Sequence, residues 1–533
     1  MISKTIYLKK QSSLFLSILS GLLLICSWPD FLFAPIIFFA WVPLFFIAQQ
    51  EKNKIRFFLH ALLSMFIWNV GTTWWIWNST AAGAIGAIVA NSLLMCIPLI
   101  GYYTMNKKYG KTIGCLSMIG FWLTFEYIHL NWQLSWPWLT LGNVFSSSSN
   151  WVQWYEYTGV SGGSLWVLAA NLAIFYFLEN VNKKPVKKAL LLPIGMIAFP
   201  ILISYLLLNN YTNRKYEPQK ENVIIVQPNI NPYTEKFAEG TAQEQIHKLV
   251  SLSEQQTDEN TRLIIWPETA LPVGVWQDQL ANTPLYQPVF DFVKLHPQIT
   301  LQTGIETYKN YGLEKATNTA KKIEGTTTYY DAFNAAISLK ANEPIQFYNK
   351  SKLVPGVETL PDFLLWLSAI FEKFGGTAGG YGHDKESKAF AVKGNPYVTA
   401  PIICYESIYG EYLTTYVNKG ANLLTIMTND GWWGNTAGHR QHLLYAKLRA
   451  IENRKWVVRS ANTGISAVID NTGKIVETKG WNEEGVIKYT VPTSATSTFY
   501  TRYGDLLFNL SAFLTGALFS FHLIAVYKKK QAK

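Results

Sequence analysis

The chain has 533 residues, of which 49% are hydrophobic, 15% are aromatic and only 15% are charged. The apolar residues are concentrated in residues 1–208 and 504–527, which excludes a wholly soluble, a disordered or a collagen-like protein. The net charge of +11 lies entirely beside these apolar segments, because residues 209–503 hold 29 Lys+Arg and 29 Asp+Glu, so anionic lipid is an expected partner and nucleic acid is not.

Eight apolar runs are each long enough to cross a membrane as a helix, which takes about 20 residues. They lie near residues 11–28, 31–49, 57–77, 81–104, 112–130, 160–179, 189–208 and 504–527. The second run contains Pro35 and Pro43, so its limits are not sharply defined. A chargeless, Trp-rich loop through residues 136–138 follows the fifth run and has the composition of a membrane interface.

The short loops predict how these helices are oriented. Every second connection is basic, and the others contain no Lys or Arg. Because basic loops are retained in the cytoplasm, we expect both termini there and residues 209–503 on the opposite face. Residues 26–29 form a poor cleavage site, so the first run is interpreted as a retained helix and not as a signal peptide.

The chain is therefore expected to contain three parts. Residues 1–208 form seven transmembrane helices, residues 209–503 an extracytoplasmic domain, and residues 504–533 an eighth helix with a basic tail. In the middle part we predict strands at residues 223–226, 263–266, 300–304, 336–339, 401–405, 423–427, 456–459, 465–469 and 485–491. Helices are predicted near residues 240–255, 285–295, 362–373 and 439–454. This alternation is typical of an α/β or a layered α+β fold.

Cys404 is the only cysteine outside the predicted membrane helices. An isolated cysteine is most often a buried and inert residue. Its position favours a nucleophile, because it directly follows an apolar strand and precedes a predicted turn, as in the nucleophile elbow of α/β enzymes.

A thiol nucleophile requires a base and a group that stabilises an oxyanion. Glu268 follows the strand at residues 263–266 and is the best candidate for the base, although a solvated carboxylate is the commoner case at a strand end. Lys350 lies in another strand-like run, where the neighbouring Lys352 makes the choice of lysine ambiguous by spacing alone. We expect Lys352 to lie nearer the solvent, because residues 355–358 are expected to end the strand.

Three runs together resemble the Glu-Lys-Cys signature of the nitrilase superfamily. They are Trp266-Pro267-Glu268-Thr269, then Tyr348-Asn349-Lys350 with Leu353-Val354-Pro355 and Glu358, and Ile403-Cys404-Tyr405-Glu406. The eight-span frame, with segments at residues 226–229, 428–434, 438–442, 449–452 and 462–466, resembles its membrane branch, the apolipoprotein N-acyltransferases. The likeness covers nearly the whole chain.

The resemblance implies an αββα sandwich in which Glu268 is the general base, Lys350 stabilises the oxyanion and Cys404 carries the acyl group. It also implies supporting roles for Glu358, Tyr405 and Glu406, and a mobile aromatic residue near Phe237 that helps to receive substrate. Two positions depart from the common pattern of the family: Gly356-Val357 stands before Glu358 where Phe-Gly is usual, and Phe237 stands where Trp is usual.

The resemblance further implies an N-acyltransferase that moves a fatty acyl chain from a phospholipid, through a Cys404 thioester, to the N-terminal amine of a diacylglyceryl-cysteine lipoprotein. Its expected partners are the phospholipid donor, the diacylated lipoprotein acceptor and membrane lipids. No cofactor or metal is expected, and His439 and His442 are interpreted as helix-start or packing residues. The protein is expected to be a monomer in the bacterial inner membrane, with the catalytic domain in the periplasm.

Two alternatives remain open. A membrane-anchored amidase or nitrilase would use water as the acceptor. A transporter or inactive lipid-binding scaffold would use Glu126 and His129 as a polar path, because ionisable residues within a membrane are often functional.

Overall fold

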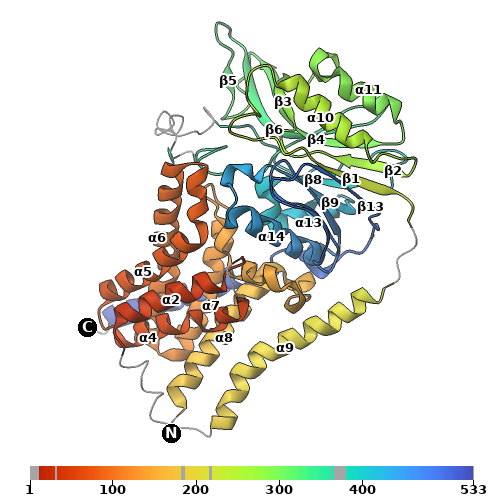
Figure 1. The fold of residues 1–533 in the computed structure, drawn as a ribbon. Helices are drawn as coiled ribbons and strands as arrows, with labels where there is room; N and C mark the ends of the chain where they lie inside the picture. The colour runs from red at the N-terminus through yellow and green to blue at the C-terminus, as the bar shows by residue number, and fades with distance from the viewer. Residues whose placement is uncertain are drawn as a thin grey trace. The chain divides into compact units, whose positions relative to one another are not determined.

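The structure is a computed structural model that describes residues 11–30, 33–181, 186–214, 219–361, 363–364 and 380–531. The chain divides into two compact units. The first contains Met1–Trp74, Ala84–Asn210 and Tyr503–Lys533, and the second contains Trp75–Gly83 and Tyr211–Arg502 (Figure 1).

Apolar helices build the first unit. Among the described residues, six helical stretches are long and apolar enough to cross a membrane, and two further apolar stretches, Ser13–Ser27 and Ala34–Gln50, are shorter. The long ones are α5 (Lys54–Thr73) continued by η3 (Trp74–Asn78), α6 (Ala81–Tyr109), α7 (Lys111–Leu130), α8 (Tyr155–Asn180), α9 (Val186–Thr212) and α16 (Leu506–Gln531). The shorter ones are α2 (Ser13–Ser27), η2 (Ala34–Ile36), α3 (Ile37–Ala40) and α4 (Val42–Gln50).

The prolines of the second apolar run mark where its helices begin. Pro35 lies in the first turn of η2 and Pro43 in the first turn of α4, where the missing proline N–H is not needed for a helical hydrogen bond. The run is therefore divided into short helical pieces and does not form one straight helix.

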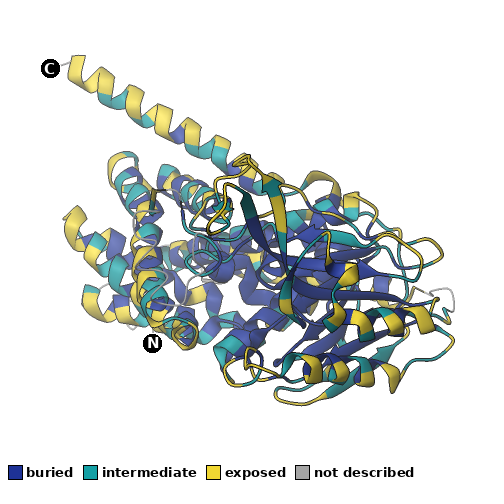
Figure 2. Ribbon diagram, turned by 90° about the horizontal axis from the view of Figure 1, so that it is seen from above, coloured by how far each residue is buried: buried dark blue, intermediate teal, exposed yellow. Residues whose placement is uncertain are grey.

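One face of α6 shows why these helices suit a membrane. Ile85, Val89, Leu93 and Ile97 follow one another at intervals of four residues, and each is between 44% and 64% exposed. A continuous apolar stripe is unfavourable in water and favourable in lipid. Most of α16 is exposed as well, as the helix that ends at the C-terminus shows in Figure 2. The first unit thus has the surface of a membrane protein.

Two β-sheets form the centre of the second unit. The larger sheet has the order β13-β1-β2-β4-β6-β5, with β3 paired to β4 and β7 to β6, and the smaller has the order β12-β11-β10-β9-β8. The strands of the larger sheet are β1 (Asn222–Gln227), β2 (Thr261–Ile265), β3 (Leu271–Trp276), β4 (Thr300–Gly312), β5 (Lys321–Lys322), β6 (Tyr329–Leu339), β7 (Gln346–Asn349) and β13 (Gly485–Tyr489). Those of the smaller sheet are β8 (Thr399–Ile403), β9 (Leu423–Thr428), β10 (Trp456–Ala461), β11 (Ser466–Ile469) and β12 (Ile475–Lys479).

Alternation along β1 shows how the layers pack. Val223 and Ile225 belong to the core shared with the smaller sheet, whereas Ile224 and Val226 belong to the core under two helices. These helices are α10 (Ala242–Glu254) and α11 (Gln287–Leu295), and α13 (Gly410–Asn418) and α14 (Ala437–Asn453) pack against the smaller sheet. The strands between them are mostly buried (Figure 2). The second unit is a four-layered α-β-β-α sandwich, so the nitrilase-like fold class is confirmed.

Each of the nine predicted strands overlaps an observed one, but four strands were not among them. β5 has only two residues, β7 was noted only as a strand-like run, and β3 and β12 carry partly exposed side chains without a continuous apolar pattern. Helix α13 was also missed. The helix predicted near residues 362–373 lies almost entirely outside the described residues.

Candidate active site

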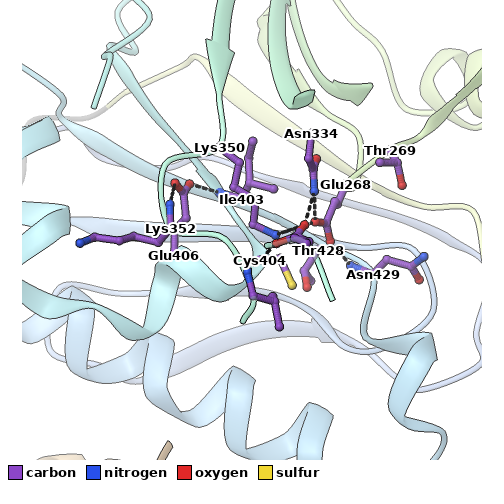
Figure 3. A network of polar contacts seen from close by, with 12 residues as sticks. Glu268, Thr269, Asn334, Lys350, Lys352, Ile403, Cys404, Glu406, Thr428 and Asn429 are labelled. Carbon is purple, nitrogen blue, oxygen red and sulfur yellow. Dashed lines mark hydrogen bonds and ion pairs between the residues drawn. The ribbon is translucent and has the colours of Figure 1, made fainter. Parts of the chain in front are cut away.

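The ends of three strands bring Glu268, Lys350 and Cys404 together (Figure 3). Glu268 follows β2, Lys350 directly follows β7 and Cys404 directly follows β8, so both sheets contribute. Lys350 Nζ lies 3.2 Å from Glu268 Oε1 and 2.8 Å from Glu358 Oε1. Each of these four residues is at most 8% exposed, so the charges interact in a site largely shielded from water.

Cys404 occupies a strained turn. Strand β8 ends at Ile403, a 3-10 helix η9 (Cys404–Ile408) begins at once, and the cysteine has a φ of +48°. A side chain other than glycine in this left-handed region costs conformational energy and is common at functional sites. Pro401 is tolerated in β8 because this strand is at the edge of the smaller sheet.

Glu268 is held from several sides. Asn334 Nδ2 donates to its Oε1 at 2.8 Å, and the Asn429 backbone N–H donates to its Oε2 at 3.2 Å. Behind it, Gly304 leaves room for the chain, because a Cβ at this position would lie 2.4 Å from the Thr269 backbone nitrogen. The carboxylate is therefore fixed by hydrogen bonds and its backbone by a close approach of β4.

The electrostatics favour different protonation states for Glu268 and Cys404. Burial alone would raise the pKa of Glu268, but the Lys350 charge, the Asn334 hydrogen bond and the Lys236 charge leave it below its ordinary value. Burial and the charge of Glu268 raise the pKa of Cys404 well above its ordinary value, although Lys350 opposes them. The resting site is thus an ionised carboxylate beside a neutral thiol, and attack requires transfer of the thiol proton.

Lys350 remains positively charged. Burial would lower its pKa, but the charges of Glu358 and Glu268 together raise the pKa well above the ordinary value. Glu358 is itself positioned by the Val354 backbone N–H, which donates to its Oε2 at 2.8 Å. Gly356, with a φ of +79°, forms the turn between them, so the departure at Gly356-Val357 still delivers the carboxylate to Lys350.

The side chain of Lys352 points to tyrosine rings, and not to the glutamates that Lys350 contacts. Its Nζ lies 5.3 Å from the ring centre of Tyr409 and 5.4 Å from that of Tyr412. Strand β7 ends at Asn349, so the two lysines do not share the face of one regular strand. Lys352 is more exposed than Lys350, as expected, but it is half-buried over aromatic rings and does not project freely into solvent.

Glu406 connects the loop after Lys350 to the turn at Cys404. Its Oε1 accepts from the Tyr348 hydroxyl at 2.5 Å and from the Ser351 backbone N–H at 2.7 Å, and its Oε2 accepts from the Ile403 backbone N–H at 2.9 Å. The side chain is fully buried. Its contacts therefore hold the backbone that follows Lys350 and the backbone that precedes Cys404 in place.

Tyr405 and Phe237 differ in their surroundings. Tyr405 is buried, and its ring lies edge-on to that of Tyr409 with centres 5.3 Å apart. Phe237 is 67% exposed and stacks on Trp432 with centres 6.2 Å apart. An exposed ring with a single stacking contact is a suitable receptor for an apolar ligand.

Asn334, Asp430 and Arg459 were not singled out from the sequence as site residues, and His442 was interpreted there as a helix-start or packing residue. His442 Nε2 lies 3.1 Å from the Cys404 carbonyl oxygen, and its Nδ1 lies 3.0 Å from Asp430 Oδ1, so its role exceeds the packing role assigned to it. Asp430 also pairs with Arg459 at 2.5 Å. A signal was present, because Asn334 and Arg459 are polar residues within largely apolar, buried strands.

Glu126 and His129 belong to the first unit. Glu126 Oε1 accepts from Trp122 Nε1 at 2.9 Å and from the Leu141 backbone N–H at 2.8 Å. His129 Nε2 lies 2.9 Å from Asn91 Oδ1. These contacts join α7 to α6 and to the segment at Leu141. They favour a packing role for Glu126 and His129 over a polar path through the membrane.

Comparison with known proteins identifies relatives for both parts of the chain. Residues 223–500 match the family described as carbon-nitrogen hydrolase, and residues 20–173 match the apolipoprotein N-acyltransferase N-terminal domain. A curated relative from Chlorobaculum tepidum, named apolipoprotein N-acyltransferase, is 32% identical and covers 97% of both chains. Proteins of the same name from Rickettsia prowazekii and Thermotoga maritima are 28% and 25% identical, over 95% and 94% of this chain and 96% and 92% of their own lengths.

Proposed function

The chain belongs to the apolipoprotein N-acyltransferases, and from this we propose that it moves a fatty acyl chain from a phospholipid to the N-terminal amine of a diacylglyceryl-cysteine lipoprotein. The observation that carries the proposal is the buried cluster of Glu268, Lys350 and Cys404, in which an ionised base and a neutral thiol lie beside a fixed positive charge.

In the first half-reaction, Glu268 takes the proton from the Cys404 thiol as Sγ attacks the ester carbonyl of the phospholipid. The carbonyl oxygen gains negative charge, which the Lys350 ammonium stabilises at a position already desolvated. When the C–O bond breaks, Glu268 returns the proton to the leaving alkoxide. The products are a lysophospholipid and a thioester on Cys404.

In the second half-reaction, the lipoprotein amine attacks the thioester carbonyl and the same oxyanion forms. Glu268 takes the proton that the amine loses and returns it to the Cys404 sulfur as the C–S bond breaks, so the products are the N-acylated lipoprotein and the free thiol. The hydrogen bonds from Asn334 and Asn429 favour an ionised Glu268 between the two halves of the cycle.

The supporting residues have separate roles in this mechanism. Glu358 holds Lys350 in place and keeps it charged, and Glu406 fixes the loop behind both Lys350 and Cys404. Tyr405 supports the turn that follows the nucleophile, and exposed Phe237 receives an acyl chain.

For the membrane arrangement, we infer eight spans, with α2 and the stretch Ala34–Gln50 as the two shorter ones. The basic loops then place both termini in the cytoplasm of the bacterial inner membrane and the domain of residues 209–503 in the periplasm. This placement gives the site access to lipids of the outer leaflet. We propose that the enzyme acts as a monomer without a cofactor.

Incubation of the purified full-length protein with a phospholipid that carries a radiolabelled acyl chain tests this function. We expect label on Cys404 and its transfer to a synthetic diacylated lipopeptide with a free N-terminal amine. Cys404→Ser should remain folded and unlabelled, because a hydroxyl is far less acidic than a thiol with a pKa of about 8.5. Label lost only to water would support an amidase, and an unlabelled wild-type protein would support a scaffold.

A further inference from the structure

A second buried lysine lies beside Glu268 and has no part in the mechanism described above. Lys236 is only 4% exposed, and its Nζ lies 2.5 Å from Thr269 Oγ1 and 3.3 Å from the Glu268 carbonyl oxygen. Burial lowers the pKa of Lys236 to about 8, although the negative charge of Glu268 opposes that shift. An ammonium group in such a position is costly unless it interacts with a specific partner.

The partner of Lys236 is a strained turn. Thr269 directly follows the general base and has a φ of +46°. This conformation is an outlier for a β-branched residue and persists only where surrounding contacts enforce it. The hydrogen bond from Lys236 to the Thr269 hydroxyl supplies such a contact, and the bond to the Glu268 carbonyl holds the preceding peptide.

The same lysine belongs to the loop that carries the exposed aromatic residue. Phe237 is adjacent in sequence and stacks on Trp432, whereas Gln245 Nε2 donates to the Lys236 carbonyl at 3.1 Å and anchors the loop to α10. Phe237 is therefore exposed to solvent, whereas its neighbour Lys236 bonds to the backbone of Glu268.

We propose that Lys236 is a positioning residue for Glu268, which holds the Thr269 turn and adds a positive charge that favours the ionised carboxylate. This inference rests on the proposed function only in naming Glu268 as the base. The positive charges of Lys350 and Lys236 act on Glu268, and the Cys404 thiol is an acid close to it. Glu358 forms an ion pair with the same Lys350. Glu268 is the charged group that acts on Lys236.

The test compares the pH dependence of two reactions of Cys404 in the purified full-length protein. One is acyl-enzyme formation from phospholipid, and the other is alkylation by iodoacetamide, quantified by mass spectrometry of the Cys404 peptide. Removing a positive charge raises the pKa of Glu268, so Lys236→Met should move the acid limb of both profiles upward by about one pH unit. Lys236→Gln should do the same while keeping an N–H donor, and Lys236→Arg should keep the wild-type limb.

Lys455 offers a matched control. It is also buried, burial lowers its pKa to about 8, and its Nζ donates to the Ser494 and Thr496 carbonyl oxygens at 2.6 Å each. Lys455→Met should leave the acid limb in place even if it lowers the melting temperature.

The proposal would be overturned if the acid limb of the pH profiles stayed in place in both Lys236→Met and Lys236→Gln. It would also be overturned if Lys455→Met moved the acid limb by the same amount as Lys236→Met. If the wild-type protein forms no acyl-enzyme, the proposed function fails, but the alkylation profile still decides whether Lys236 controls Glu268.

Discussion

Lys350 and Lys352 differ by two positions in sequence and by their whole environment. Lys350 is 1% exposed between two glutamates, whereas Lys352 covers tyrosine rings. We expect Lys350→Ala to slow acyl-enzyme formation a hundredfold or more, because the oxyanion loses its charged partner. Lys352→Ala should slow the reaction less than about tenfold, since it removes cation–π contacts and a charge near Glu406 and leaves Lys350 in place.

Both rates are measured by the appearance of label on Cys404 at equal expression of the two variants. A larger loss in Lys352→Ala would mean that the oxyanion is stabilised by the other lysine.

Glu406 is a residue whose loss should affect folding and catalysis together. Glu406→Ala removes the buried acceptor of the Tyr348 hydroxyl and of the backbone N–H groups of Ser351, Lys352 and Ile403, which should reduce the free energy of unfolding by about 3 kcal/mol or more. Thermal unfolding in detergent measures the change. Glu386→Ala is the control, since Glu386 is highly exposed and pairs with Lys419 at the surface, and its melting temperature should match the wild type. Equal melting temperatures for all three proteins would refute the supporting role.

At the scale of elements, the approach of β4 to the Glu268 turn is unusually close. Gly304→Ala would place a Cβ 2.4 Å from the Thr269 nitrogen and 2.8 Å from the Glu268 Cα, so the base must shift. A displacement of about 1 Å can cost a hundredfold in rate, and we expect a loss of that order in acyl-enzyme formation. Gly195→Ala in α9 meets nothing within 4 Å and should keep the wild-type rate. Wild-type kinetics in Gly304→Ala would show that the turn adapts freely.

The connection between α5 and α6 is a second element with a defined role. Trp75 is fully buried with its ring centre 4.9 Å from that of Trp433, and Asn78 Nδ2 donates to the Trp433 carbonyl oxygen at 2.8 Å. Trp433 ends η10 (Asp430–Trp433), which follows the Asn429 that bonds to Glu268. A segment between two apolar helices is thereby part of the second unit.

Trp75→Ala should reduce the free energy of unfolding by about 3–5 kcal/mol, because a large buried ring leaves a cavity. Trp77, in the same segment, is 55% exposed, and Trp77→Ala should change the free energy of unfolding by no more than about 0.5 kcal/mol. Thermal unfolding, with limited proteolysis around residues 429–436, distinguishes the two. Similar stability of both variants would contradict a structural role for this connection.

At the scale of the whole molecule, the basic loops predict which face of the membrane carries the second unit. Lys315 lies in an exposed stretch at residues 312–318, so trypsin added to right-side-out spheroplasts should cut there. Lys315→Gln should remove that fragment and serve as the control. Cleavage seen only in inverted vesicles would place the domain in the cytoplasm and reverse the topology.

The apolar helices, nine strands and the candidate residues Glu268, Lys350 and Cys404 could all be predicted from the sequence. These features are local, because hydrophobic periodicity, strand ends and motif spacing are set by neighbours along the chain. The sequence could not determine β3 or β12, whose side chains are partly exposed and lack a continuous apolar pattern.

Which side chains contact one another became known from the fold. Lys236 bonds to Thr269 across 33 positions, His442 lies beside the Cys404 carbonyl across 38, and Asn78 reaches Trp433 across 355. The direction of Lys352 likewise depends on the point where β7 ends. Such contacts depend on sheet order and layer packing, which bring distant residues together without leaving a pattern along the chain.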